Sequence, residues 1–218
     1  MLGGSCLYGF LSLSLYCQHK KIYTIMDNST NSKMSELFKE GIFFAPSRTY
    51  GEQYIEPIIR EVLDLNKSKT NENDAIDKMG KYFEIKSSKV LKLTKKEKKL
   101  SLIEKILLEN DKNVVNRLIN FEDCYTASYL SNIQNIKRDH FSNLVYVMLF
   151  KDCIKIFISK KEEICNIPNW CGKHGKYDAL DKNGQFGITK NNVKWHIENN
   201  LYETLTWDKV YKIAEKIK

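Results

Sequence analysis

Two carboxylates and one lysine stand at spacings that could support hydrolytic chemistry. Asp74, Glu84 and Lys86 all lie in the stretch DAIDKMGKYFEIK, residues 74–86. If residues 78–80 form a hairpin turn, Asp74 lies opposite Glu84, with cross-strand Cβ atoms roughly 5 Å apart. Lys86 follows Glu84 by two residues and therefore points to the same face of its strand. The spacing predicts a patch of two carboxylates and one ammonium.

Such a patch suits a hard divalent cation. Magnesium prefers oxygen ligands and keeps several of its waters. It can activate a water and stabilise the charge that develops on a phosphodiester, while a lysine positions the attacking water or helps to deprotonate it. We expect Asp74 and Glu84 to hold Mg²⁺ and Lys86 to orient the water. Repulsion between the two carboxylates should raise the pKa of one of them when no metal is bound.

The apolar neighbours of Glu84 distinguish it from an ordinary solvated charge. The same Glu-x-Lys spacing recurs at Glu97 and Lys99, but inside the charged run KKEKK. Glu84 instead stands in YFEIK, where burial of a carboxylate is costly unless a neighbour compensates it. A metal site and a structural ion pair both explain this arrangement.

The sequence around the patch alternates between helical and strand patterns. Residues 143–159, NLVYVMLFKDCIKIFIS, predict two strands around a Lys-Asp turn, and QFGIT predicts another strand. Ser159 and Glu162 have capping-box spacing for a short helix, and Asn191 and Thr206 are expected to cap two final helices. Helices are also expected over residues 50–65, 100–107 and 113–120. The alternation predicts an α/β or α+β domain with one mixed sheet.

The bulk composition predicts one domain with a basic surface. We expect residues 1–33 to be a poorly ordered N-terminal extension and residues 34–218 to be a single domain. The apolar run LYGFLSLSLY in the extension is too short to span a bilayer. The net charge of +8 favours polyanions, although abundant Lys, Asn and Ile could also reflect an AT-rich genome. The six cysteines form no dense framework, which favours a reducing, cytoplasmic location.

A second stretch, DALDKNGQFGITK at residues 178–190, closely resembles the first. It is expected to form a second hairpin around Asn183 and Gly184. Ile188 stands where the first stretch has its glutamate, so the second stretch cannot repeat a metal site. Shared ancestry and coincidence between two short turns both explain the likeness.

The loop at residues 166–186 carries side chains that suit DNA. Lysine and histidine can contact phosphate or guanine, and asparagine and glutamine can read base edges. The expected DNA-contacting residues are Lys173, His174, Lys176, Asn183 and Gln185. Cys165, Cys171 and His174 form a cluster whose spacing is loose for zinc, and ordinary thiols explain the cysteines equally well.

Asp74, a gap of nine residues, and then Glu84-Ile85-Lys86 resemble the motif of the PD-(D/E)XK nuclease superfamily. Asn73 stands where many members have proline. Members commonly carry a glutamate on the helix before the hairpin, so the resemblance implies that Glu56 or Glu52 supports the site. Glu56 is favoured because it directly precedes the apolar run PIIREVL.

A longer segment strengthens the resemblance. Residues 131–157 are similar to the segment after the catalytic hairpin in many type II restriction endonucleases, with Gln134 and Asp152 at the matching positions. The resemblance implies an α/β fold in which a central mixed β-sheet is flanked by helices, the restriction-endonuclease-like core. The catalytic hairpin would then be residues 74–88.

The resemblance also implies a function. The expected activity is Mg²⁺-dependent hydrolysis of phosphodiester bonds in double-stranded DNA, typical of a sequence-specific type II restriction endonuclease. Such enzymes often act as homodimers on palindromic DNA sites, and no membrane partner is expected. A DNA-repair or junction-resolving nuclease with the same core is an alternative, and so is a DNA-binding protein without catalysis.

Overall fold

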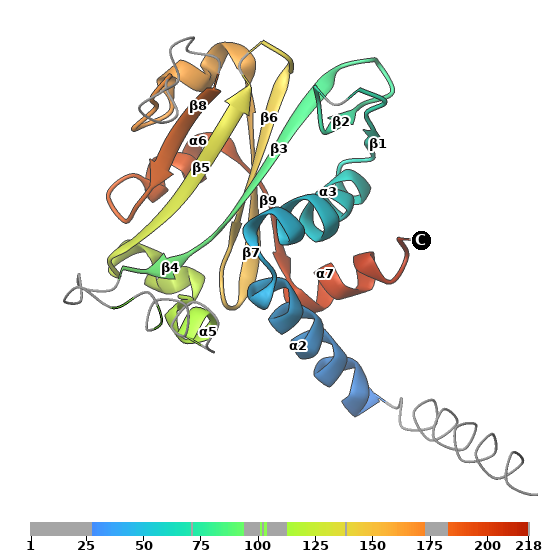
Figure 1. Cartoon of the computed structure of the whole chain (residues 1–218), viewed down its shortest axis with the longest axis vertical. Coiled ribbons are helices and arrows are strands. Elements are labelled where there is room, and N and C mark those ends of the chain that lie inside the picture. Colours follow the sequence, from blue (N-terminus) through green and yellow to red (C-terminus); the bar gives the residue numbers. More distant parts are fainter. Residues whose placement is uncertain are drawn as a thin grey trace, which may run out of the picture. The chain divides into compact units, whose positions relative to one another are not determined.

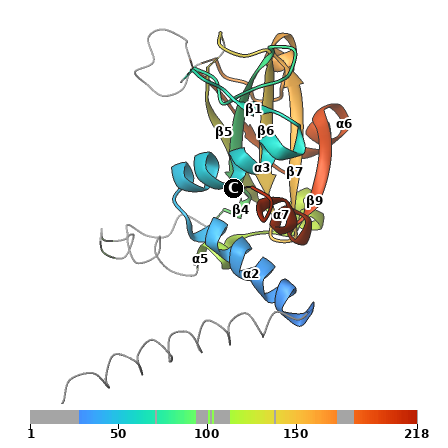
Figure 2. The same ribbon diagram turned by 90° about the vertical axis from the view of Figure 1, so that its right-hand side faces the viewer.

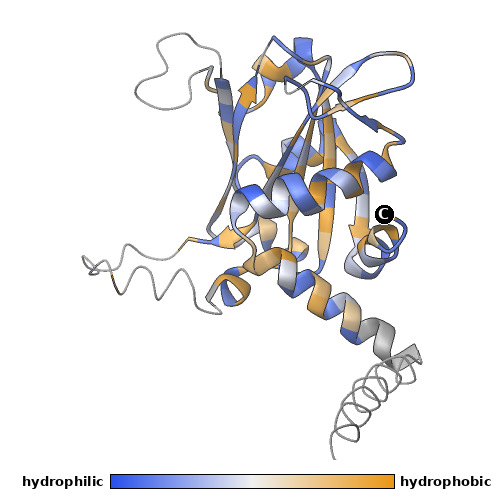
Figure 3. Ribbon diagram, turned by 45° about the vertical axis from the view of Figure 1, so that its right-hand side comes forward, coloured by the Kyte–Doolittle hydropathy of each residue, from blue (hydrophilic) through white to orange (hydrophobic). Residues whose placement is uncertain are grey.

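The apolar sequence 143–160 forms the centre of a six-stranded mixed sheet. NLVYVML is strand β6 (Asn143–Leu149), CIKIFISK is β7 (Cys153–Lys160), and the two pair antiparallel. Every residue of β6 after Asn143 is buried, because both faces of this strand are covered. The long central strands accordingly carry much of the hydrophobic colour in Figure 3. The predicted strand pair and its Lys-Asp turn are confirmed.

The sheet runs in the order β1-β2-β3-β6-β7-β9, and a separate three-stranded sheet has the order β4-β5-β8 (Figure 1). Within the six-stranded sheet, β3 and β6 are parallel and every other pair is antiparallel. The α/β class with a mixed sheet flanked by helices is confirmed, whereas the expectation of one sheet is wrong. The other strands are β1 (Asn66–Lys67), β2 (Ala75–Ile76), β3 (Tyr82–Lys89), β4 (Leu91–Lys92), β5 (Tyr129–Lys137), β8 (Asn183–Ile188) and β9 (Leu201–Thr206).

The computed structural model describes residues 28–70, 72–93, 101, 103, 113–137, 139–172 and 183–217. The chain forms two compact units, residues 1–38 and 39–218. Helix α2 (Asn28–Phe44) begins inside the range expected to be an extension. The helix expected over 100–107 falls almost wholly outside the described residues. No helix among the described residues has the length and apolar character that a bilayer crossing needs.

The helix predicted over residues 50–65 is confirmed, in two parts. A π-helical segment η1 (Thr49–Ile55) leads directly into α3 (Glu56–Val62). Pro57 falls in the first turn of α3, directly after the π-helical segment. Helix α3 packs against β3 and against the last helix, α7 (Trp207–Ala214), and both helices lie in front of the large sheet in Figure 2.

The opposite face of the large sheet packs against β5, β8 and α6 (Val193–Asn200). Tyr146 of β6 stacks on Phe157 of β7, with ring centroids 4.9 Å apart, and Phe186 of β8 meets Tyr146 edge-on. His196 of α6 completes this cluster, and its Nδ1 lies 2.9 Å from the Tyr146 hydroxyl. Burial lowers the pKa of His196 to about 4, so this histidine is neutral at pH 7 and belongs to the core.

Three short helices complete the described elements. They are α5 (Asn113–Arg117) and the 3₁₀ helices η2 (Phe121–Tyr125) and η3 (Lys161–Asn166). The helices expected at 113–120 and after Ser159 are therefore present. The Asp152 carboxylate, in the turn between β6 and β7, accepts a hydrogen bond of 2.8 Å from the Phe121 amide and so anchors η2.

The predicted helix caps have mixed outcomes. Thr206 caps α7 as expected, because its Oγ1 accepts a hydrogen bond from the Lys209 amide. The capping box at Ser159 is wrong: Lys160 is the residue before η3, and the Ser159 hydroxyl donates to the Lys160 carbonyl. The prediction that Asn191 caps a helix is also wrong, by one position. Asn192 precedes α6, and its Oδ1 accepts from the Thr189 amide instead of capping the helix.

Candidate active site

The hairpin register that brings the carboxylates together is confirmed. Ala75 pairs with Phe83 and Ile76 with Tyr82, and the Asp74 amide donates a 3.2 Å hydrogen bond to the Phe83 carbonyl. This register places Asp74 beside the position of Glu84 on the neighbouring strand.

The turn of the hairpin is fixed by its own residues. Asp77 accepts hydrogen bonds of 2.8 Å from the amides of both Met79 and Lys81. Gly80 has a φ of 81°, a conformation that costs a residue with a Cβ atom free energy. Asp77 therefore serves the turn, and its sequence likeness to Asp74 does not extend to the candidate site.

The two strands separate at Asp74, and this separation creates the site. Beyond Ala75 the ladder ends, and the Ile85 amide donates to the Asp74 carboxylate over 2.7 Å. A backbone donor of β3 thus holds the carboxylate at the edge of the sheet. An ionised acceptor makes this hydrogen bond stronger than a neutral pair would.

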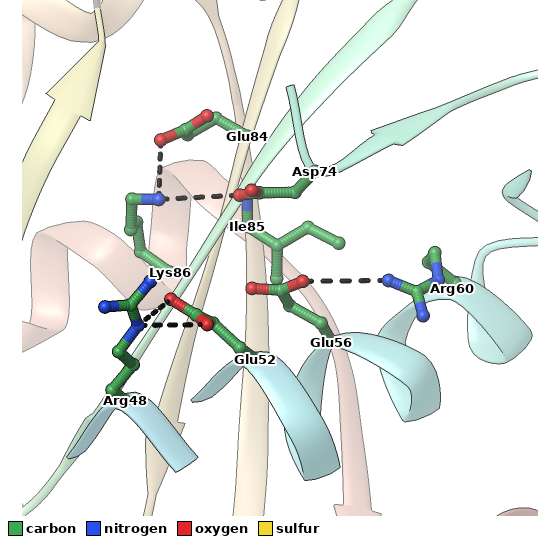
Figure 4. Close-up of polar contacts among 8 residues, drawn as sticks. All are labelled: Arg48, Glu52, Glu56, Arg60, Asp74, Glu84, Ile85 and Lys86. Carbon is green, nitrogen blue, oxygen red and sulfur yellow. Dashed lines mark hydrogen bonds and ion pairs between the residues drawn. The ribbon is translucent and has the colours of Figure 1, made fainter. Parts of the chain in front are cut away.

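Lys86 lies between the two carboxylates (Figure 4). Its Nζ is 2.5 Å from Glu84 Oε1 and 3.4 Å from Asp74 Oδ2. Glu84 and Lys86 share a face because they are two residues apart on β3. The structure therefore brings together the three residues that the sequence singled out, with the ammonium as the bridge.

Glu84 is the most buried member of the group. Its side chain is 1% exposed, and neither carboxylate oxygen has a hydrogen-bond partner among the described residues. Oε1 has the ion pair with Lys86, and Oε2 has no hydrogen-bond partner among the described residues. A buried carboxylate oxygen without a partner is costly. This orphaned oxygen fits the oxygen ligand that a hard divalent cation takes.

Burial is the main electrostatic effect at Glu84. It raises the pKa of the carboxyl above its ordinary value, Lys86 opposes the rise, and Asp74 adds to it. The repulsion expected between the two carboxylates is thus present but secondary. At Lys86, burial lowers the pKa, but the charges of Asp74 and Glu84 outweigh that effect and raise it overall. Lys86 is therefore an ammonium at pH 7, able to donate hydrogen bonds and not to accept a proton.

Glu56 approaches the same group from the start of α3. Burial, followed by the charge of Asp74, raises its pKa to about 7, and its carboxylate lies 3.6 Å from the Arg60 guanidinium. Glu52 instead pairs with Arg48 at 3.1 Å, and its side chain is 55% exposed. Of the two glutamates that the sequence left open, the geometry favours Glu56.

The expected DNA-contacting residues divide into two groups. Lys173, His174 and Lys176 lie outside the described residues. Asn183 and Gln185 lie on β8 and alternate with buried residues, so they share its less buried face. The predicted turn at Asn183 and Gly184 is wrong, because both residues pair with β5, opposite Lys137 and Ile136.

Asn183 also lines a cavity of about 290 Å³ that sequence reasoning did not find. Among the described residues, Lys137, Asp139 and His140, from the end of β5 and the turn that follows it, also line the cavity. The run KRDH that directly precedes the apolar strand was the available signal. Such a run is ordinary for a solvated turn, and only the pairing of β5 with β8 brings Asn183 to it.

The cysteine cluster gains no support as a metal site. Cys165 and Cys171 are exposed, and His174 lies outside the described residues. Within the described ranges, no three His, Cys, Asp or Glu side chains gather closely enough to hold a metal ion. A cation at the hairpin would thus have two carboxylates from this group and would complete its shell with water.

No family model matches the chain, and no curated protein matches it.

Proposed function

We propose that this protein is a Mg²⁺-dependent endonuclease that hydrolyses phosphodiester bonds in double-stranded DNA, with the sequence specificity of a type II restriction enzyme. The observation that carries the proposal is the Asp74–Lys86–Glu84 arrangement at the point where β2 and β3 separate. The basic chain, with a net charge of +8, adds general attraction to a polyanion.

The proposed roles follow from the positions of the side chains. Asp74 and Glu84 would hold Mg²⁺, and the Glu84 Oε2 atom, which accepts no hydrogen bond from a described residue, would gain the ion as a partner. An ion bound there would activate a water and neutralise charge on the scissile phosphate. Lys86 donates hydrogen bonds as an ammonium, so it orients the attacking water or a phosphate oxygen. Glu56 would accept a hydrogen bond from a water of the site.

The direct test uses unmethylated DNA of varied sequence with Mg²⁺. We expect discrete fragments from the wild type and an activity lower by about 10³-fold in Lys86→Met, because a positioned donor at the reacting group is lost. Lys81→Met is the matched control, since Lys81 is exposed on the same hairpin and bonds to the turn through its backbone amide and carbonyl. Its activity should equal that of the wild type.

The outcomes separate the alternatives. Cutting confined to branched DNA, without sequence preference, would indicate a repair or junction-resolving nuclease instead of a restriction enzyme. DNA binding that Lys86→Met leaves intact, with no cutting by the wild type under any divalent ion, would point to a non-catalytic binder. Loss of cutting with retained binding in the variant supports the proposal.

A further inference from the structure

The cavity beside β8, called here the Lys137–Asn183 pocket, combines two elements that are distant in sequence. Lys137 ends β5, Asp139 and His140 belong to the turn that follows, and Asn183 begins β8. Lys137 and Asn183 are direct partners in the β5–β8 ladder. Because both sit on paired strands, the ladder holds their backbones in place.

The turn that lines the pocket leads to the start of β3, the strand that carries Glu84 and Lys86. The turn after β5 leads into β6, and the Ser142 amide donates a 2.9 Å hydrogen bond to the Tyr82 carbonyl of β3. In the parallel register of β3 with β6, Leu144 is then the partner of Glu84. The pocket lining therefore lies along the chain that leads directly to the neighbour of the candidate active site.

The chemistry of the lining favours a nucleobase over a phosphate. A phosphate site gathers donors and positive charge, whereas this pocket also presents the Asp139 carboxylate, which is 84% exposed and lies 4.0 Å from the Lys161 ammonium. Base edges offer donors and acceptors together. Lysine suits guanine, an asparagine amide suits adenine, and a carboxylate accepts from the amino group of cytosine. A cavity of about 290 Å³ is large enough for the edge of one base.

A contact also connects the pocket to the catalytic hairpin. His140 Nδ1 lies 3.5 Å from the Glu72 carboxylate, and Glu72 is two residues before Asp74. Both side chains are substantially exposed, so the pair contributes little stability in water. Its position nevertheless places the pocket beside the segment that carries a proposed metal ligand.

We infer that the Lys137–Asn183 pocket is a base-reading subsite, in which Lys137, Asp139 and Asn183 determine the base preferred at one position beside the scissile phosphate. This inference rests on the proposed function, because it names the part of the DNA substrate that the subsite contacts. Lys137 and Asp139 extend the set of DNA-contacting residues beyond those expected from the sequence.

The experiment is cleavage of a randomised DNA library, sequenced before and after digestion. The variants are Asn183→Ala and Asp139→Asn; the second is isosteric at an exposed position, so it preserves the fold. We expect the preference at one base position to fall by about 5- to 150-fold in Asn183→Ala, the range for loss of one good base contact, and to shift to another base in Asp139→Asn. Asn191→Ala, at an exposed position after β8, is the control and should preserve the wild-type preference.

Each outcome bears on the inference separately from the proposed function. If the wild type cuts at preferred sites and both variants keep its preference, the pocket does not read a base. A uniform loss over all sequences, with a shallower dependence of binding on salt, would show a phosphate contact instead and would overturn the inference. If the wild type binds DNA without cutting, the same preferences are measured on the bound fraction. A wild type that neither cuts nor binds DNA overturns the proposed function itself.

Discussion

The stretches 74–86 and 178–190 share much of their sequence, but their aligned glycines, Gly80 and Gly184, have different structural roles. Gly80 forms a hairpin turn at a φ of 81°, and a Cβ atom there would meet open space. Gly184 lies in β8, opposite Ile136, where a Cβ atom would come within 2.0 Å of the Trp170 ring. The first glycine is required by backbone conformation and the second by the close approach of a side chain.

The aligned residues Glu84 and Ile188 show the same contrast. Both are buried, at 1% and 0% exposure. Glu84 has an ammonium 2.5 Å away, whereas Ile188 lies in the apolar core cluster with Phe186. A strand position can carry a buried charge only where its neighbours compensate that charge. The likeness between the two stretches therefore does not extend from sequence to environment.

The largest expected effect comes from placing the missing carboxylate in the second stretch. Ile188→Glu would bury a charge among apolar side chains, and Lys190, two residues further on, is exposed. We expect the free energy of unfolding to fall by roughly 4 kcal/mol at pH 7, as for an uncompensated buried charge. Burial would raise the pKa of the new carboxyl, so its destabilising effect should grow as the pH rises from 4 to 8.

The measurement is denaturant unfolding of wild type and Ile188→Glu at several pH values. Ile188→Gln is the control, since it has nearly the same size and cannot ionise. A loss in Ile188→Glu that does not change with pH would show that steric mismatch, and not charge, distinguishes the two stretches.

The hairpin was predictable from the sequence because its determinants are local. Asp77 and Gly80 fix the turn, the turn fixes the register, and the register determines which residues meet. The Lys137–Asn183 pocket was not predictable, because its two sides meet only through pairing of β5 with β8. The second stretch was wrongly predicted to form a turn for the same reason. Gly184 looks like a turn residue in the sequence, and only the folded structure shows that it makes room for the Trp170 ring.

The two glycines provide the second prediction. Gly184→Ala should destabilise the protein by roughly 2 kcal/mol, because a new methyl group would displace the packed Trp170 ring. Gly80→Ala should cost about 1 kcal/mol, from its positive φ alone. Thermal melting of both variants in wild-type and Trp170→Ala backgrounds separates the causes. The cost at Gly184 should largely disappear without the tryptophan, and the cost at Gly80 should be unchanged; equal costs in both backgrounds would contradict the steric explanation.

A smaller effect concerns pH and the charged environment of the first stretch. The pKa of Glu56 is raised from 4.5 to about 7, chiefly by burial and next by Asp74. Because the pKa of Glu56 is higher in the folded protein than in the unfolded chain, Glu56 makes its whole contribution to stability below pH 4.5. This contribution is lost as the pH rises through about 7. Glu56→Gln removes this loss, so without metal the variant should exceed the wild type in stability by roughly 1 kcal/mol at pH 8, allowing for partial solvent exposure.

Chemical denaturation at pH 4 and pH 8, in the presence of a chelator, tests the prediction for Glu56. Glu52→Gln is the matched control, because Glu52 is exposed and lies one turn away on the same helical segment. A larger gain from the Glu52 variant than from the Glu56 variant would mean that the two glutamates have been assigned the wrong way round.

The smallest effect is expected at Asp77, and it tests which aspartate belongs to the site. Asp77→Asn keeps an oxygen that can accept from the Met79 and Lys81 amides, so stability should change by less than about 0.5 kcal/mol. Mg²⁺ should stabilise this variant and the wild type alike, by roughly 2.7 kcal/mol at a hundredfold excess over the dissociation constant. Asp74→Asn should lose that gain, and it should not gain stability from relieved repulsion, because Asp74 also pairs with Lys86. Thermal melting with and without Mg²⁺ measures both effects. A metal response that is lost in the Asp77 variant and kept in the Asp74 variant would place the metal ligand at the turn and overturn the assignment of Asp74.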